Sequence, residues 1–323
     1  FLSVPTVVQL SSIAYVDLVF AFYAFLAFGS LFEYFRERSA VWLMLSGLFA
    51  GGSWAVKYTG MQYTMLLFVL VLLEHLISRR KKISPFVLLL PLISFVVVFP
   101  YLVRNWVATG WPLFPFNLGP FPLTSGLNWD IERGSLFLKW LSGFGSGGDL
   151  VDKLLAPILV FVRGEFGNLD RFDGVAGPVF LLVPVLLLLY KKSRESWLII
   201  LFTVLLIYYW AFTTQQLRFL LPVLPILAYL LAEGLQRVGK RPLVYRAWAL
   251  VVWNLAVGAN EAFKGNPARF WTGRESREQF LTARVMGYPL YQESNKVIGE
   301  CGRVAKVFLV NMRNFGYLLD CPW

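Results

Sequence analysis

Apolar residues along this chain gather in eight continuous blocks that are separated by short polar segments. A helix that crosses the hydrocarbon core needs about 20 predominantly apolar residues. Because apolar and polar residues do not alternate within the blocks, membrane-spanning strands are not expected. The pattern therefore predicts an all-α polytopic membrane bundle of about eight transmembrane helices, at residues 12–33, 41–58, 61–78, 84–103, 175–190, 195–213, 218–236 and 244–261.

Basic residues in the short loops predict how the bundle is oriented. Cytoplasmic loops carry an excess of Lys and Arg, and the opposite short connections hold only Lys57 and Arg218. We therefore expect a multi-pass protein of the inner (plasma) membrane with both ends of this piece on the outer side. The loops assigned to the cytoplasm together hold thirteen basic residues, namely Arg36, Arg38, Arg79, Arg80, Lys81, Lys82, Lys191, Lys192, Arg194, Arg237, Lys240, Arg241 and Arg246.

The longer polar segments predict the domain organisation. Residues 1–261 form the expected transmembrane domain, with a long outer loop at 104–174. Residues 262–323 are mixed and polar, so they start a small soluble outer domain, which a strand-like run at 306–310 assigns to the α/β class. Because the chain begins at Phe1 and not Met, we expect an internal piece of a longer protein. The sequence does not decide whether Cys301 and Cys321 form a disulfide.

Composition narrows the classes of function. The 323 residues are 57% hydrophobic and 15% charged, whereas soluble domains are about 45–50% apolar and about 25% charged. The net charge of +11 does not indicate nucleic acid, because the basic residues lie between apolar blocks. One histidine and two cysteines cannot build a zinc cluster, and no glycine-rich phosphate loop is present. No cofactor is predicted, and the need for a divalent metal stays open.

Ionisable groups at membrane depth are costly and are functional candidates by default. Arginine presents a fixed fork of donors that suits phosphate. Each candidate also has a structural interpretation: Asp17 as a helix cap, Lys57 as a snorkelling lysine and Trp106 as an interfacial anchor. The candidates all fall on the expected outer side, and they are Asp17, Lys57, Tyr58, Arg104, Asn105, Trp106, Gln216 and Arg218.

Four segments together resemble a known family. The segments are Ala14–Asp17, the glycine-rich Gly47–Gly60, Pro100–Pro115 and Gln216–Pro225, in which Phe219 stands where Tyr is usual. In this order they resemble the GT-C membrane glycosyltransferases, nearest to the bacterial relatives of protein O-mannosyltransferases and of the lipid A aminoarabinose transferase.

The resemblance implies an enzyme of the cell envelope that moves a sugar from a polyprenyl-phosphate donor to a lipid- or protein-linked acceptor. The family's principal catalytic aspartate is then expected upstream of Phe1, and Asp17 inherits a secondary acidic role. Arg218, Arg104 and Lys57 are expected to bind the donor phosphate. The substrate pocket is expected to include Tyr58, Asn105, Trp106 and Gln216.

Three other classes of function remain open. An O-antigen-type polymerase or ligase also uses lipid-linked donors and long outer loops. A secondary transporter also places charges inside a bundle, although transporters favour internal repeats and broken helices near the midplane. In a scaffold protein, the outer charges would be incidental.

Overall fold

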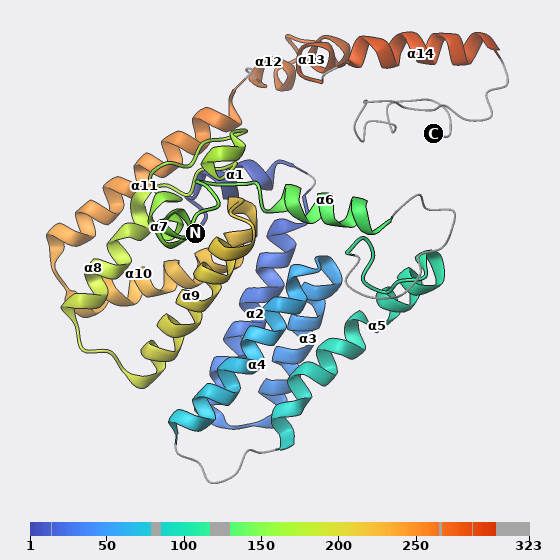
Figure 1. The fold of residues 1–323 in the computed structure, drawn as a ribbon. Coiled ribbons are helices and arrows are strands. Elements are labelled where there is room, and N and C mark those ends of the chain that lie inside the picture. The colour runs from blue at the N-terminus through green and yellow to red at the C-terminus, as the bar shows by residue number, and fades with distance from the viewer. Residues whose placement is uncertain (14, 79–84, 117–129, 265–266, 286, 302–323) are drawn as a thin grey trace. The chain divides into compact units, whose positions relative to one another are not determined.

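The computed structural model describes residues 1–13, 15–78, 85–116, 130–264, 267–285 and 287–301 (Figure 1). The chain divides into two compact units, Phe1–Ala259 and Asn260–Trp323. In the described residues of the first unit, all regular elements are helices. In chain order they are α1 (Pro5–Ser11), α2 (Asp17–Glu37), α3 (Ala40–Val56), α4 (Thr59–Ile77), η1 (Pro85–Leu88), α5 (Leu89–Thr109), α6 (Ile131–Leu141), α7 (Leu150–Leu159), η2 (Leu169–Arg171), η3 (Pro178–Leu181), α8 (Leu182–Leu189), α9 (Arg194–Thr213), η4 (Leu217–Val223), α10 (Leu224–Val238) and α11 (Arg241–Ala262).

The length and composition of these helices confirm a membrane-embedded helical bundle. Six helices within the described ranges are long and apolar enough to cross a bilayer. Two further helices, Ala40–Val56 and Pro178–Leu189, are apolar but shorter, so the structure supports six spans and not the full eight. The six are Asp17–Glu37, Thr59–Ile77, Pro85–Thr109, Arg194–Thr213, Leu217–Val238 and Arg241–Ala262.

Two expected boundaries were wrong. The helix expected at 12–33 begins later and ends later, because α1 ends at Ser11 and α2 spans Asp17–Glu37. The fourth block does not end at residue 103, because α5 continues to Thr109 and carries Arg104 on its last turns. A charge marks the edge of the hydrocarbon core but does not end a helix. The helix ends where Gly110 adopts a left-handed conformation with φ of 77°.

Small residues bring α3 close to α5. A Cβ at Gly51 would lie 2.7 Å from Val97 Cβ and 2.8 Å from the carbonyl oxygen of Ser94 on α5. One turn away, Ser94 Oγ donates to the carbonyl oxygen of Gly47 at 2.9 Å. Membrane helices pack through such small-xxx-small faces, because lipid offers no hydrophobic driving force for association. α3 thus lies between α2 and α5, and α4 packs beside it (Figure 1).

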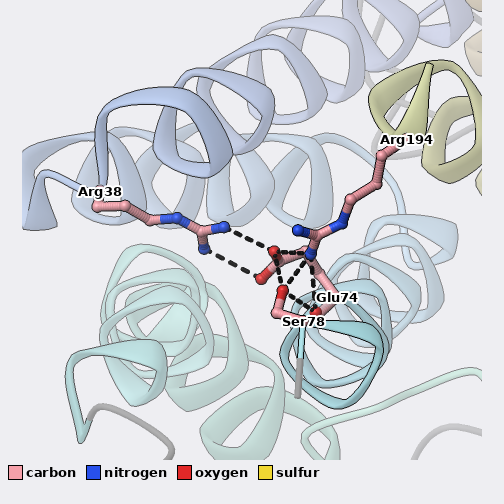
Figure 2. Close-up of polar contacts among 4 residues, drawn as sticks. All are labelled: Arg38, Glu74, Ser78 and Arg194. Carbon is pink, nitrogen blue, oxygen red and sulfur yellow. Dashed lines mark hydrogen bonds and ion pairs between the residues drawn. The ribbon is translucent and has the colours of Figure 1, made fainter. Parts of the chain in front are cut away.

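The buried carboxylate of Glu74 joins three segments at the C-terminal end of α4. Glu74 is 2% exposed and accepts hydrogen bonds from both terminal nitrogens of Arg38, at 3.0 and 2.6 Å. Arg194, at the start of α9, bonds to the same carboxylate at 2.5 Å and to Ser78 (Figure 2). The hydrogen bond with Glu74 raises the pKa of the Arg38 guanidinium. The α2–α3 turn, α4 and α9 are therefore held together here.

The second unit is helical where it is described. It contains α12 (Ala268–Trp271), α13 (Arg277–Arg284) and α14 (Tyr288–Cys301). Ser276 and Gln279 form a reciprocal capping box at the start of α13. The strand expected at 306–310 and the cysteine at 321 lie outside the described residues.

Candidate functional site

Three charged side chains from three parts of the sequence meet around one aromatic ring. Lys57 Nζ lies 2.5 Å from Asp17 Oδ1 and 3.5 Å from the centroid of the Phe219 ring. The guanidinium carbon of Arg218 lies 5.3 Å from the same centroid. We call Asp17, Lys57, Arg218 and Phe219 the Phe219 cluster. Two cations and one carboxylate give the cluster one excess positive charge.

A close turn between α3 and α4 brings Lys57 to the start of α2. Lys57 follows the last residue of α3 in an extended conformation, and its N–H donates to the carbonyl oxygen of Ser53 at 3.1 Å. At the start of α4, a Cβ on Gly60 would lie only 2.3 Å from the backbone nitrogen of Trp54. Only glycine fits such a close approach of two backbone segments. The Gly60 position therefore determines where the Lys57 side chain can reach.

The surroundings of Lys57 favour its neutral form more than bulk water does. Burial lowers the pKa of the Lys57 ammonium below the ordinary value of 10.5. The carboxylate of Asp17 raises the pKa, and the positive charge of Arg218 lowers it further. Since desolvation is the largest of these effects, the net direction is downward. Asp17, only 2% exposed, is the partner that compensates the buried cation.

A neutral amide orients Arg218. Arg218 Nε donates to Gln216 Oε1 at 2.9 Å, and Gln216 Nε2 donates to Asp173 Oδ2 at 2.6 Å. Phe172 and Asp173 both adopt positive φ, of 67° and 45°, which is uncommon for residues other than glycine and marks strained positions. No described carboxylate bonds directly to Arg218, so its charge is available to an anion.

Tyr58, the residue after Lys57, forms a second polar group with Asn105. Asn105 Nδ2 donates to the hydroxyl of Tyr58 at 2.6 Å, and that hydroxyl donates to the carbonyl oxygen of Phe114. Asn105 Nδ2 also reaches the carbonyl oxygen of Pro112 at 3.3 Å. Burial is the largest cause that raises the pKa of the Tyr58 hydroxyl, so this group stays protonated. Tyr58 thereby ties the end of α5 and the following segment to the turn that carries Lys57.

Two of the expected site residues do not join these groups. Arg104 is exposed and makes no hydrogen bond or ion pair with any residue that the structure describes. Trp106 is 61% exposed on α5 and does not line the cavity described below. Asp17, Lys57 and Arg218 are brought together, Gln216 supports Arg218, and Asn105 supports Tyr58.

A cavity of about 360 Å³ lies beside the Phe219 cluster. α4 and α9 form its main walls, η4 closes one side, and residues of α6 and of the segment after α5 contribute to the rim. Phe219 and Tyr58 line it, so the ring that Lys57 contacts is also a wall of the cavity. The lining residues are Phe20, Tyr58, Thr59, Met61, Gln62, Tyr63, Leu66, Leu113, Phe116, Leu138, Leu141, Ser142, Leu206, Tyr209, Trp210, Thr213, Thr214, Phe219, Pro222 and Val223.

Several contributors to the site were not predicted from sequence. Phe219 was noticeable in the sequence, because it stands where the resembled family usually has Tyr. Its contact with Lys57 could not be predicted. No sequence signal marked Asp173 or Gln62, because a polar residue in a loop or at the start of a helix is common. Within the part of the chain that the structure describes, no group of three or more His, Cys, Asp and Glu residues could hold a metal ion.

A family model matches residues 1–225, well over half of the chain. The chain belongs to the DUF8201 family, which is described as a domain of unknown function. The matched region of this DUF8201 protein contains the whole Phe219 cluster and all residues that line the cavity. No curated protein and no solved structure shows a significant match.

Proposed function

We propose that this DUF8201 protein is a membrane glycosyltransferase that moves a sugar from a polyprenyl-phosphate donor to a lipid- or protein-linked acceptor on the outer face of the inner membrane. The observation that supports it best is the convergence of Lys57 and Arg218 on Phe219, beside a cavity at one end of the helical bundle. A lipid phosphate needs cationic groups at headgroup level, and the sugar that it carries needs an adjoining space. The resemblance of four segments to GT-C enzymes points the same way.

The proposal also covers the number of membrane crossings and the side on which the ends lie. The shorter helices Ala40–Val56 and Pro178–Leu189 also cross the membrane, which makes eight spans with both ends outside. The Phe219 cluster then lies at the outer water boundary, and Glu74 lies at the cytoplasmic one. The basic loops support this orientation.

In the proposed reaction, the bond between the anomeric carbon and the phosphate oxygen breaks. The electron pair leaves with the polyprenyl phosphate, and an acceptor oxygen or nitrogen forms the new bond to the anomeric carbon. The acceptor's proton goes to a general base, a role that a carboxylate can fill. Asp17 keeps the secondary role of holding Lys57, to which it is bonded.

Arg218 carries the main electrostatic role. Its partner Gln216 is neutral, so its charge can stabilise the phosphate as negative charge develops on the leaving oxygen. Lys57 shares its charge with Asp17 and contributes less. Gln216 and Asp173 act through Arg218 as positioning residues.

Turnover of a polyprenyl-phosphate-linked sugar by the complete gene product in lipid nanodiscs tests this function. Arg218→Ala should lower turnover about 100-fold, the cost typical of removing one donor to a developing negative charge. Arg218→Lys should recover part of it, since the charge stays but the fork is lost. Arg246→Ala is the matched control, because Arg246 is exposed and its side chain makes no hydrogen bond or ion pair within the described residues. Unchanged turnover in Arg218→Ala would refute the assignment.

A further inference from the structure

The apolar face of α7 points away from the rest of the protein. Its inward side carries Ala156, followed by Val160 at the helix end, and both are 0% exposed. On the opposite side, apolar side chains recur every three to four residues and are 44–65% exposed. A surface helix of a soluble protein shows the reverse arrangement, with its apolar stripe toward the core. The exposed residues are Leu150, Val151, Leu154, Leu155, Ile158 and Val162.

α7 begins at the end of α9 that adjoins the Phe219 cluster. Lys153 Nζ lies 5.9 Å from the centroid of the Phe212 ring, which is in the last turn of α9. Just before α7, the backbone N–H of Ser146 donates to Gln215 Oε1 at 3.0 Å. Gln215 leads directly into η4, which contains Phe219. The helix and the candidate site are therefore at the same end of the bundle.

Lipid is the partner that fits the exposed face of α7. α7 packs against α9, which is long and apolar enough to cross a bilayer. The exposed residues Val204, Tyr208 and Phe212 of α9 lie on one stripe of that helix and continue the apolar surface to the start of α7. Leu154–Val162 then gives nine consecutive residues without a polar side chain. A contiguous apolar surface of this kind marks a contact with a membrane or another protein, and here it continues a lipid-facing one.

The length of α7 and the charges at its ends determine how it can lie in a membrane. Ten residues of helix are about 15 Å long, half of the roughly 30 Å hydrocarbon core, so α7 cannot cross. Charged residues precede the apolar stretch, at Asp149, Asp152 and Lys153, and Arg163 follows it. Both ends therefore stay near the water boundary, and the helix lies along the interface.

We infer that α7 lies at the lipid headgroup level, with its exposed apolar face inserted among the upper acyl chains of the leaflet beside the Phe219 cluster. Interfacial helices bury their apolar face by about 5–10 Å. Part of the segment expected as an outer loop thus belongs to the membrane. The inference depends on the helical membrane bundle and not on sugar transfer, and the contact between Ser146 and Gln215 connects this anchor to the segment that leads into η4.

Collision rates of nitroxide spin labels with oxygen and with a water-soluble nickel chelate test the inference. The complete protein, with Cys301→Ser and Cys321→Ser, is placed in nanodiscs of phosphatidylcholine and phosphatidylglycerol that hold one copy each. Single cysteines at Leu155 and Ile158 carry the label on the exposed face of α7.

Two reference positions calibrate the labels. Leu169→Cys is the matched control, because Leu169 is 48% exposed and Leu155 is 44% exposed, but Leu169 is in η2 beside Asp170. Val204→Cys, at a side chain 42% exposed in the middle of α9, reports the depth of a span. Since all labelled side chains are exposed, each variant should keep the thermal midpoint of the cysteine-free protein.

The labels at Leu155 and Ile158 should collide often with oxygen and several-fold less often with the nickel chelate than the label at Leu169. Their depths should be similar, about 5–10 Å below the headgroups, and shallower than that of Val204. Nickel collisions at Leu155 as frequent as at Leu169 would place the face in water and overturn the inference. Protection from both reagents would also overturn it, because another part of the same chain would then cover the face. A depth equal to that of Val204 would contradict an interfacial position.

Discussion

The Lys57 ammonium lies 2.5 Å from the Asp17 carboxylate, although the two residues are 40 positions apart. Their side chains are 19% and 2% exposed. The pair joins the start of α2 to the turn between α3 and α4, and the ammonium also faces the ring of Phe219 in η4. One lysine thus links the site to three elements that are far apart in sequence.

Asp17→Asn should destabilise the protein by about 3 kcal/mol, because it leaves a largely buried ammonium without its counter-charge. The midpoint of thermal unfolding in detergent measures this. In the double variant Asp17→Asn/Lys57→Met, most of the loss should be recovered, since neither charge remains. Glu33→Gln is the control, because its pair with Arg36 is exposed and should change the midpoint little. Equal midpoints for wild type and Asp17→Asn would contradict the assigned role.

The affinity of the protein for a polyprenyl phosphate without a sugar should fall as the pH rises toward 10.5. Lys57 should lose its charge in this range, at a lower pH than an ordinary lysine does. The ammonium is charged below its pKa, and burial lowers the pKa of Lys57 below that value. In the window between the folded and the ordinary pKa, the unfolded chain binds more protons, so the stability of the fold should rise with pH while anion binding declines.

Lys57→Arg should remove this dependence, since arginine stays protonated throughout the range. Calorimetric titration at several pH values compares the two proteins. A wild-type profile as flat as that of Lys57→Arg would show that Lys57 does not hold the phosphate.

At the other end of α4, the variants around Glu74 should follow a definite order of stability loss (Figure 2). Glu74→Gln should cost about 3 kcal/mol, because it removes a buried carboxylate from two arginines. Arg38→Ala should cost less than Glu74→Gln and more than Arg194→Ala. Arg38 bonds to both carboxylate oxygens through two nitrogens and is 26% exposed, whereas Arg194 reaches the carboxylate through one nitrogen and is 48% exposed. Thermal midpoints establish the order, with Arg36→Ala as an exposed control. Equal losses for Arg38→Ala and Arg194→Ala would contradict it.

Gly51→Ala should destabilise the bundle by about 1–3 kcal/mol, because the new methyl group would overlap Val97 and the backbone of Ser94. Gly29→Ala is a matched control within an apolar helix, since a Cβ there would meet nothing within 4 Å. It should be neutral or slightly stabilising, because alanine favours helix more than glycine does. Thermal unfolding of both variants decides the matter. A larger loss for Gly29→Ala would show that the α3–α5 contact is not the tight one.

Much of the fold was predictable from the sequence. Continuous apolar blocks predicted helices and a membrane bundle, in which Gly47 and Gly51 of α3 lie against α5. Asp17, Lys57 and Arg218 were each marked by charge next to an apolar block. Arg104 bore the same mark, but it is exposed and unpaired among the described residues. Local charge therefore identified candidates without ranking them.

The contacts between the candidates were not predictable, because they join positions that no local pattern relates. Gln216 bonds to Asp173 across 43 positions, and the backbone at Asp173 has a positive φ that its side chain does not require. The cavity likewise depends on α4 and α9, which are more than 100 positions apart and form its main walls.

The order of apolar and polar residues alone determined that this is a helical membrane protein, since spanning a bilayer requires long apolar helices whose backbone bonds are internal. Tertiary structure decided which charges pair and which residues line a cavity. That choice depends on helix packing and on turns such as the one at Gly60, where backbone atoms approach so closely that a single methyl group would separate them.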